Sequence, residues 1–477
     1  MSYEVVMGLE VHVELATTSK IFCSCPNDSS AEANANICPA CAGMPGMLPV
    51  TNINVVNKAI AAGLVTNCTI NRVNTFDKKN YYYPDLSNSY QTTQMYAPVC
   101  VNGWVEIETA NGPKKIRIKQ IHMEEDAGKL LHDDTVGCSL VDYNRCSVPL
   151  VEIVSQPDFN SADEVIAYLE KLRSLLRYAE VGHCKLEAGL MRCDVNLSVR
   201  KKGSEELGVR TEIKNMNSFT AIRKAIAYET ERHIDALEWG TEELVQETRG
   251  WDSVKNVSFS MREKENATDY LYFPEPNLPP VIIDEDWIES VREQLPEMPD
   301  KKYQRYVDEL GIREKDARQI TASPNLAALF EQLLAGGIQP SQAVGWIIVE
   351  ALALGNKAGC GPDDINFDAD KLAAVLHLLE EEKITRNGAR EVFAAIFNDD
   401  VDPLAYIKEH GLDNVADAGA VRELLVQIVN DNPKSVSDFK QGKTKAMDFL
   451  FGQAMRQLKG SGDPKQIREI LSELLNS

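Results

Sequence analysis

The sequence predicts an α+β fold in its first part and an all-α fold after it. Up to residue 294, Gly, Asn and Pro separate many short segments in which apolar and polar residues alternate, as in half-buried strands. From residue 295 on, apolar residues recur at helical spacing in short units that begin close to prolines. A chain of 477 residues is too long for one hydrophobic core. We therefore expect three domains, at 1–294, 295–411 and 412–477.

Within the first part, helical spacing predicts three helices, at about residues 55–64, 161–178 and 218–238. No apolar run approaches the roughly 20 residues of a membrane span, and the sequence begins without a secretory leader. We therefore expect a cytoplasmic protein that does not associate with membranes. A net charge of −22 repels polyanions at long range, so a nucleic-acid partner would have to meet local basic patches.

The first predicted strand carries ionisable groups along one face. Alternation in residues 7–15 places Glu10, His12 and Glu14 on one side, and Leu9, Val11, Val13 and Leu15 on the other. Two carboxylates that flank an imidazole favour a metal ion between them, or base chemistry. An ordinary solvated strand face is the alternative.

A second strand has a similar polar face. In residues 192–200 every even position is polar and every odd position apolar, so that one face holds Arg192, Asp194, Asn196, Ser198 and Arg200. An acid, an amide and two guanidinium groups together suit a phosphate and its counter-ion.

A third alternating segment, residues 116–129, ends in acids. Its apolar phase slips at Gln120, which predicts a β-bulge. Glu124, Glu125 and Asp126 then precede a glycine turn. Because neighbouring strand residues face opposite sides, at most one of Glu124 and Glu125 would be a direct metal ligand, unless the turn brings them together.

Glu152 is a lone carboxylate in the apolar run 148–154. Burial of an unpaired charge costs several kcal/mol, so this group needs a cation nearby, unless one face of the strand is open to solvent. Glu187 and Lys214 occur at predicted strand ends and could also be ordinary surface residues.

Four of the eleven cysteines form two close pairs, Cys23 with Cys25 and Cys38 with Cys41. Paired thiolates of this kind can close a tetrahedral zinc site with no open position, which favours structural zinc. Scattered core cysteines are the alternative, and this interpretation suits the other seven better.

Two further segments point to nucleic acid. Residues 76–86 combine Lys78 and Lys79 with three tyrosines, which could hold phosphates and stack a base, or could form a packed turn. Between residues 433 and 468, basic residues outnumber acidic ones, which suggests an RNA-contacting tail or a solvated helical face. The basic residues are Lys434, Lys440, Lys443, Lys445, Arg456, Lys459, Lys465 and Arg468, against Asp438, Asp448 and Asp463.

Carboxylates gathered with His, Arg and Lys on a floor of strands are what phosphoryl transfer through Mg²⁺ requires. The motifs together resemble the GatB family, the B subunits of aspartyl/glutamyl-tRNA amidotransferases. The strings that carry this resemblance are residues 7–12, 79–81, 83–86, 121–129, 139–145, 191–200, 272–276 and 449–453.

The resemblance implies an ATP-dependent and Mg²⁺-dependent transamidation. The side-chain carboxylate of Glu-tRNA(Gln) or Asp-tRNA(Asn) would be phosphorylated and then attacked by ammonia, which a GatA subunit frees from glutamine in a heterotrimer with GatC. It also implies a glutamine synthetase-like cradle domain on an antiparallel sheet, then an all-α helical domain, then a YqeY-like tail that binds misacylated tRNA.

Carried onto this sequence, the resemblance assigns Glu10, His12, Glu125 and Glu152 to the metal and kinase site, with Glu124, Glu187 and Asp194 as neighbours. Lys79, Arg192, Arg200 and Lys214 would counter phosphate charge. The four paired cysteines resemble a zinc-bearing branch of the family. Family members often have His and Arg at the positions of Thr268 and Leu271, and Arg at the position of Gly250. Because this chain lacks that charge, the loop around residues 266–272 stays outside the expected site.

Two other functions fit some of these features. A stand-alone carboxylate–amine ligase of the glutamine synthetase type would use the same metal floor, but would not need a basic helical tail. The other is a zinc-containing RNA-binding module without catalysis, for which alanine at Glu125 would leave turnover of the assembled complex intact.

Overall fold

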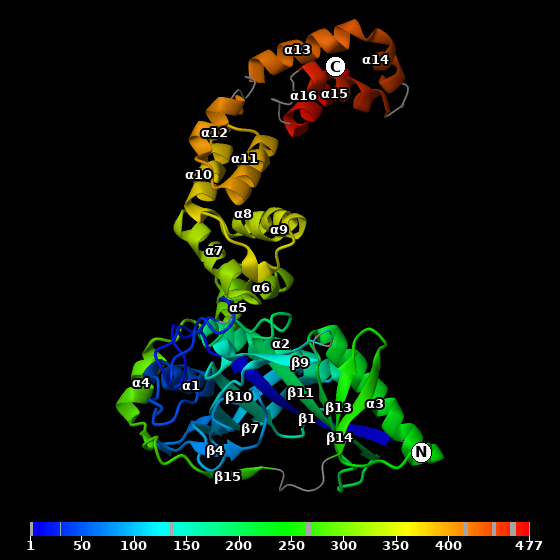
Figure 1. Cartoon of the computed structure of the whole chain (residues 1–477). Coiled ribbons are helices and arrows are strands. Elements are labelled where there is room, and N and C mark those ends of the chain that lie inside the picture. The colour runs from blue at the N-terminus through cyan, green and yellow to red at the C-terminus, as the bar shows by residue number, and fades with distance from the viewer. Residues whose placement is uncertain are drawn as a thin grey trace. The chain divides into compact units, whose positions relative to one another are not determined.

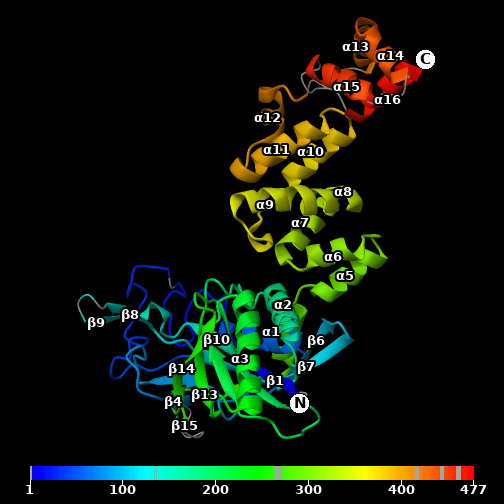
Figure 2. The same cartoon turned by 90° about the vertical axis from the view of Figure 1, so that its right-hand side faces the viewer.

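The computed structural model describes residues 3–28, 30–133, 135, 137–263, 270–413, 418–440, 445–457 and 464–476. Its contacts form two compact units, Met1–Met298 and Pro299–Ser477. The first unit combines a large sheet with helices, and the second is helical (Figures 1 and 2). The expected α+β character and helical C-terminal part are therefore confirmed. A further division at residue 411 stays a prediction.

A nine-stranded sheet forms the centre of the first unit, in the order β14-β13-β12-β11-β1-β10-β7-β6-β2. In chain order its strands are β1 (Tyr3–Glu14), β2 (Thr69–Ile70), β6 (Cys100–Thr109), β7 (Gly112–Glu125), β10 (Pro149–Ser155), β11 (Met191–Lys201), β12 (Thr211–Lys214), β13 (Glu247–Asp252) and β14 (Val257–Glu263). The first strand of the chain thus lies in the middle of the sheet.

The sheet is mixed, so the expectation of a purely antiparallel sheet is wrong at one place. Among the described strands of this sheet, β12 and β13 pair in parallel and the other neighbours are antiparallel. The chain between them forms α3 (Phe219–Trp239), because a parallel pair needs a long crossover connection.

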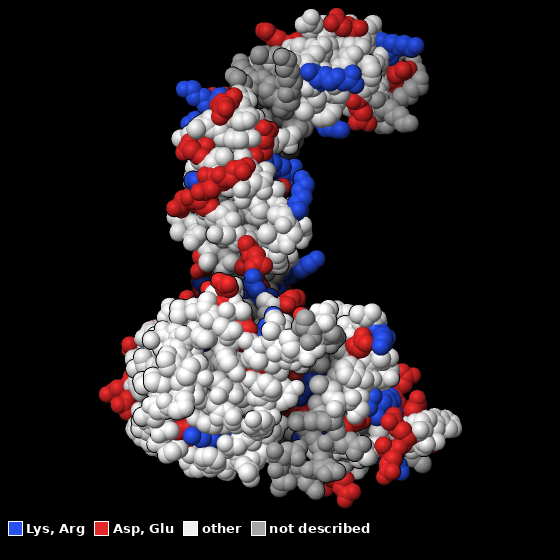
Figure 3. Space-filling model, viewed as in Figure 1, with Lys and Arg blue, Asp and Glu red and all other residues white. Residues whose placement is uncertain are grey.

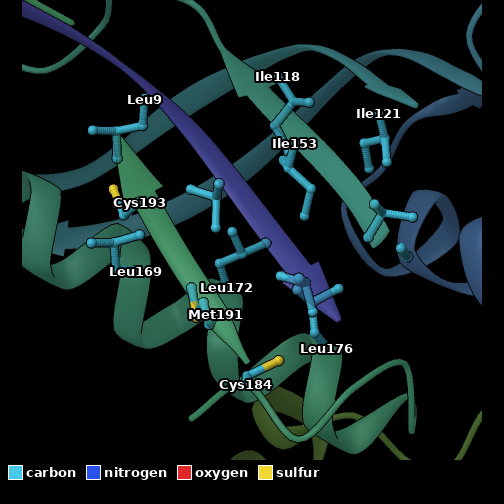
Figure 4. Packing of buried hydrophobic residues seen from close by; sticks show 14 of the residues in the cluster. Leu9, Ile118, Ile121, Ile153, Leu169, Leu172, Leu176, Cys184, Met191 and Cys193 are labelled. Carbon is cyan, nitrogen blue, oxygen red and sulfur yellow. The ribbon is translucent and has the colours of Figure 1, made fainter. Parts of the chain in front are cut away.

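One face of the sheet is apolar and helices cover it. Leu9, Val11 and Val13 of β1 are fully or almost fully buried, as the alternation predicts. Figure 4 shows Leu169, Leu172 and Leu176 of the helix α2 (Ala162–Tyr178) packed beneath the strands that carry Leu9 and Cys193. The opposite face is left for polar side chains.

The three expected helices of the first unit are confirmed as α1 (Ile53–Val65), α2 (Ala162–Tyr178) and α3. α2 begins after Ser161, whose side chain accepts a hydrogen bond from the Glu164 amide, and Glu164 in turn accepts from the Asn160 amide. These contacts satisfy amides that the first helical turn leaves free. A further helix of this unit is α4 (Glu285–Glu293).

The expected bulge near Gln120 is also confirmed. The pairing of β10 with β7 shifts between Val154, which lies opposite Gln120, and Ser155, which lies opposite Ile118. Because of this extra residue in β7, Ile121 and Met123 point into the core while His122 and Glu124 reach the polar face.

Three small sheets accompany the large one in the first unit. In chain order their strands are β3 (Val73–Asn74), β4 (Asp77–Asn80), β5 (Tyr90–Thr93), β8 (Lys129–Asp133), β9 (Cys138–Asp142), β15 (Leu271–Pro274) and β16 (Val281–Ile282). The strands β15, β4 and β5 form one sheet, in which Tyr272 lies opposite Lys79. A 3-10 turn, Tyr143–Arg145, follows β9.

The second unit consists of helices. They are α5 (Pro299–Asp308), α6 (Glu314–Thr321), α7 (Pro324–Ala335), α8 (Pro340–Gly345), a π-helical turn (Trp346–Ala351), α9 (Leu352–Ala358), a 3-10 turn (Pro362–Asp364), α10 (Ala369–Glu380), α11 (Arg386–Asp399), α12 (Pro403–His410), α13 (Ala418–Asp431), α14 (Pro433–Lys440), α15 (Lys445–Gln457) and α16 (Pro464–Asn476). Pro324, Pro340, Pro403 and Pro433 each open a helix, as expected.

The last four helices share a hydrophobic cluster of their own, which includes Leu425, Leu450 and Leu471. Of the basic tail, Lys443 and Lys459, together with Asp463, lie outside the described residues, as does Thr268 of the first unit. In the part of the chain that is described, no helix is both long and apolar enough to cross a bilayer.

Charge is unevenly distributed over the visible surface of the first unit. Figure 3 shows a broad area over α1 and β4 with few charged side chains, and acidic and basic side chains elsewhere. The exposed apolar residues Met44, Met47, Leu48, Val50 and Ile53 precede or begin α1.

Candidate active site

The register of the central strands brings ionisable side chains together on the polar face of the sheet. On β1, His12 lies opposite Glu152 of β10 and opposite Arg192 of β11. Glu10 lies opposite Asp194 of β11. Because paired residues of neighbouring strands face the same side, groups that are far apart in sequence meet on one surface.

The first group consists of His12, Glu124 and Glu152, whose ligand atoms all lie within 4.8 Å of one another. His12 Nε2 is 3.4 Å from Glu124 Oε1 and 3.5 Å from Glu152 Oε2. His122 joins them, with its Nε2 3.0 Å from Glu152 Oε2. Glu124 is 3% exposed, so its carboxylate is removed from bulk water.

These groups strongly affect one another's ionisation. Burial lowers the pKa of His122, but the carboxylates of Glu152 and Glu124 outweigh burial and raise it to about 10. The same carboxylates raise the pKa of His12 against the effect of burial. Burial alone would raise the pKa of Glu152, yet the two imidazoles hold it well below its usual range. The site therefore favours positive charge between the two carboxylates.

A second group consists of Glu10, Asp194 and Glu212, from three neighbouring strands, again with ligand atoms within 4.8 Å of one another. Lys214 bridges it, with an ion pair to Asp194 and another of 3.1 Å to Glu212 Oε1. Burial raises the pKa of Glu10, and the charges of Glu152 and Glu212 raise it further.

Hydrogen bonds fix two of these carboxylates. Thr248 Oγ1 donates to Glu212 Oε2 at 2.7 Å. The Asn196 side-chain amide donates to Glu10 Oε1 at 3.0 Å. The carboxylates are thereby oriented before any ligand binds, which reduces the cost of assembling a charged site.

The first group, together with Glu10 and Glu212 of the second, lines one cavity of about 390 Å³. Its wall includes Lys79 of β4, with Tyr270 and Tyr272 around β15. Lys79 Nζ lies 4.9 Å from the centre of the Tyr270 ring, a cation–π distance. Burial lowers the pKa of Lys79, but Glu124 and other neighbours raise it overall, so this side chain stays a cation.

Glu125 faces the other side of β7 from Glu124. Its Oε1 accepts from the Thr92 amide at 2.9 Å, and its Oε2 accepts from Ser147 Oγ at 2.7 Å. Burial raises the pKa of Glu125, and these hydrogen bonds oppose that effect. Of the two acids that the sequence leaves open, Glu124 is thus the one that lies among the potential ligands.

Arg192 lies opposite His12, beside the first group, but its guanidinium is paired with Asp126, 3.1 Å from Oδ1. Two other expected site residues lie apart. Arg200 shares the polar face, but lies six residues along β11 from Asp194, about 20 Å in a strand, and pairs with Glu4 at 2.6 Å. Glu187 is exposed and precedes β11. The structure brings together Glu10, His12, Glu124, Glu152, Asp194, Lys79 and Lys214.

Sequence reasoning did not single out His122 or Glu212 as site residues. His122 is two residues before Glu124, and Glu212 is two residues before Lys214. Period-two alternation from either known position would have placed them on the same face.

The two cysteine pairs also converge. Cys41 Sγ lies 3.9 Å from Cys38 Sγ and 4.0 Å from Cys25 Sγ, and the four sulfurs, with Cys23, are all within 4.8 Å of one another. A hydrogen bond from Cys23 is the main reason that the pKa of Cys41 falls to about 4. A thiolate among thiols is a state from which a soft metal ion can be bound.

Comparison with known proteins identifies the family of the chain. Residues 5–289 match the GatB/GatE catalytic domain family, and residues 328–475 match the GatB domain family. The chain is 51% identical over 474 residues to the B subunit of the aspartyl/glutamyl-tRNA(Asn/Gln) amidotransferase of Lachnoclostridium phytofermentans, which covers 99% of each chain. It is 48% identical to the protein of the same name from Caldicellulosiruptor bescii, over 100% of this chain and 99% of the relative. The chain therefore belongs to the GatB family, the B subunits of the aspartyl/glutamyl-tRNA(Asn/Gln) amidotransferase.

Proposed function

We propose that the first unit uses ATP and Mg²⁺ to activate the side-chain carboxylate of Glu-tRNA(Gln), Asp-tRNA(Asn) or both, and then converts it to the amide with ammonia. The observation that carries the proposal is that one cavity is lined by His12, Glu124 and Glu152 and by Glu10 and Glu212, the last two grouped with Asp194. The name of the relatives, which specifies a tRNA-dependent amidotransferase, supports it.

The first carboxylate group fits a divalent cation. Octahedral Mg²⁺ with ligands at about 2.1 Å places neighbouring ligand atoms about 3.0 Å apart and opposite ones about 4.2 Å apart. The distances of 3.4 and 3.5 Å from His12 Nε2 to the two carboxylates lie between these values. His12, Glu124 and Glu152 would hold the Mg²⁺, which would supply positive charge to the phosphates.

The reaction itself balances without a covalent enzyme intermediate. A substrate carboxylate oxygen attacks the γ-phosphorus of ATP and ADP leaves. Ammonia then attacks the acyl carbon, phosphate leaves, and the nitrogen loses a proton. Lys79 and Lys214, both at the cavity, supply fixed positive charge to the phosphates. Neither lysine needs to react, since positioning and electrostatics carry phosphoryl transfer.

The cysteine cluster is proposed as a structural zinc site. Tetrahedral zinc with sulfur ligands at about 2.3 Å separates the sulfurs by about 3.8 Å. The distances of 3.9 and 4.0 Å between Cys41 and its neighbours fit this arrangement. Zinc there would tie residues 23–41 into one loop.

The remaining parts of the proposal concern partners and fold. Ammonia would come from a GatA subunit in a heterotrimer with GatC, and misacylated tRNA would contact the cradle and the C-terminal tail. The relation of the first unit to the glutamine synthetase fold is part of the same proposal. A large sheet with a polar face as the floor of the cavity supports it.

The decisive experiment uses the purified chain with and without its partner subunits, supplied with Glu-tRNA, ATP, Mg²⁺ and free ammonium. Amide formed from ammonium in the absence of glutamine would support activation by this chain. ATP-dependent amide formation on free glutamate would instead identify a stand-alone ligase. Binding of tRNA without ATP hydrolysis in any combination would identify a non-catalytic module.

A further inference from the structure

One exposed aromatic side chain at the edge of the large sheet has no role in the proposed reaction. Phe259 of β14 is 47% exposed, although it lies on a sheet edge beside charged strands. It pairs with Gly250 of β13, which pairs in turn with Lys214 of β12. Since paired residues share a face, Phe259 lies on the same face as Lys214 and the carboxylates.

The Phe259 ring leans inward across β13. A Cβ placed on Gly250 would lie 2.6 Å from Cζ of this ring and 3.1 Å from Cε1 and Cε2. No side chain larger than hydrogen fits at residue 250 unless the ring moves. The glycine therefore lets the ring tip extend over β13, toward the strand that carries Lys214.

The spacing of the strands matches the length of a nucleotide. β14 is two strands from β12, which places Phe259 about 10 Å across the sheet from Lys214. A nucleoside triphosphate whose phosphates lie at Lys214 and the carboxylates would carry its base about this far away. An exposed ring at that distance, on the same face, is suited to stacking.

We propose that Phe259 is the stacking platform for an adenine base, and that this base is the adenine of ATP. This inference rests on the proposed function, because it takes the cavity as the place where the triphosphate binds. The 3′-terminal adenosine of the aminoacyl-tRNA presents the same base, so the test must separate these two sources.

The test measures KM for ATP and KM for Glu-tRNA in the assembled amidotransferase. Phe259→Leu keeps an apolar side chain on Gly250 and removes the aromatic ring, whereas Phe259→Tyr keeps the ring. Val254→Ala removes another exposed apolar group, in the turn between β13 and β14, and serves as the matched control.

We expect Phe259→Leu to raise KM for ATP at least about fivefold, with KM for Glu-tRNA unchanged. Phe259→Tyr and Val254→Ala should keep both values close to wild type. A rise in KM for Glu-tRNA alone would assign the ring to the terminal adenosine and overturn the assignment to ATP. Unchanged KM values, with or without lower stability, would leave the ring a purely structural role and overturn the inference.

Calorimetric titration of ADP into the same complexes separates this inference from the proposed function. If the wild-type complex binds ADP but makes no amide, the proposed function fails. In that case, weaker ADP binding by Phe259→Leu than by the wild type, Phe259→Tyr and Val254→Ala would still support the stacking role. If the wild-type complex is active and Phe259→Leu binds ADP as wild type does, the stacking role fails alone.

Discussion

His12 Nε2 and Glu152 Oε2 lie 3.5 Å apart on neighbouring antiparallel strands, although 140 positions separate them in the chain. Glu124 completes this contact from the strand beyond. The three side chains share a face only because the pairings of β1 with β10 and of β10 with β7 are in this register. A slip of one residue in either pairing would turn the side chains of the slipped strand to the opposite face and separate the group.

Glu124 and Glu125 offer a matched pair of substitutions. Glu124→Gln should lower ATP-dependent amide formation in the assembled complex at least about a hundredfold, because it removes a charged oxygen from the cation group. Glu124→Gln should also raise the concentration of Mg²⁺ needed for half-maximal activity. Glu125→Gln should raise that concentration much less than Glu124→Gln does, since Glu125 contacts Thr92 and Ser147 instead. Titration of activity with Mg²⁺ measures both. An equal shift in the two variants would contradict this division of roles.

Removal of one cysteine ligand should release zinc. Cys38→Ser is expected to reduce bound zinc, measured by atomic emission, from equimolar to a small fraction, because the remaining three ligands leave the tetrahedron open. Cys138→Ser changes an exposed thiol elsewhere in the chain and should leave the zinc content as it is. Equal zinc content in the two variants would argue against the site.

The core beneath the active site should be sensitive to cavities. Leu172 of α2 is fully buried in the cluster shown in Figure 4. Leu172→Ala should lower the free energy of unfolding by about 2–5 kcal/mol in urea denaturation, because the sheet above cannot collapse onto the space. Glu170→Ala, at an exposed position of the same helix, should change it by less than about 0.5 kcal/mol.

His233 of α3 should make the first unit sensitive to acid. This imidazole is fully buried and its Nε2 lies 2.9 Å from Thr211 Oγ1. Burial, together with Arg232 and Arg249, lowers its pKa from 6.5 to about 4. The charged groups around it are Glu229 and Arg232 of α3, and Glu247 and Arg249 of β13.

Because the folded state binds the proton more weakly than the unfolded state, the neutral imidazole contributes its full stability above about pH 6.5. That contribution is lost as the pH falls from 6.5 toward 4, and at pH 5 the loss is about 2 kcal/mol. Urea midpoints at pH 7.5 and 5.0 should therefore differ more in wild type than in His233→Gln. His132→Gln, which removes an exposed imidazole of β8, should behave as wild type.

Much of the site could be predicted from alternation alone. The faces that hold Glu10 with His12, and Asp194 with Asn196, follow from a period of two, and the bulge at Gln120 follows from a break in it. Pairing between strands could not be predicted, because it depends on contacts between residues that are far apart in sequence. Arg200 shares the correct face and still lies about 20 Å along its strand from Asp194.

The parallel pairing of β12 with β13 could not be predicted for the same reason, since it joins segments that are far apart in sequence. Local pattern predicts the helix α3 and places Lys214 at a strand end before it. A connection through this 21-residue helix permits β12 and β13 to pair in parallel without requiring it. Glu212 and Lys214 enter the site because β12 joins the sheet beside β11, and nothing in their local sequence specifies that neighbour.

The position of β1 has a consequence for synthesis. Tyr3–Glu14 leaves the ribosome well before its two neighbours in the sheet, Pro149–Ser155 and Met191–Lys201. At about 5–20 residues per second, the nascent segment waits roughly ten to thirty-five seconds for the later of the two. During that interval the apolar face of the strand and its unpaired backbone edges can contact wrong segments. The newborn chain should therefore depend on chaperones that hold this strand until translation passes residue 201.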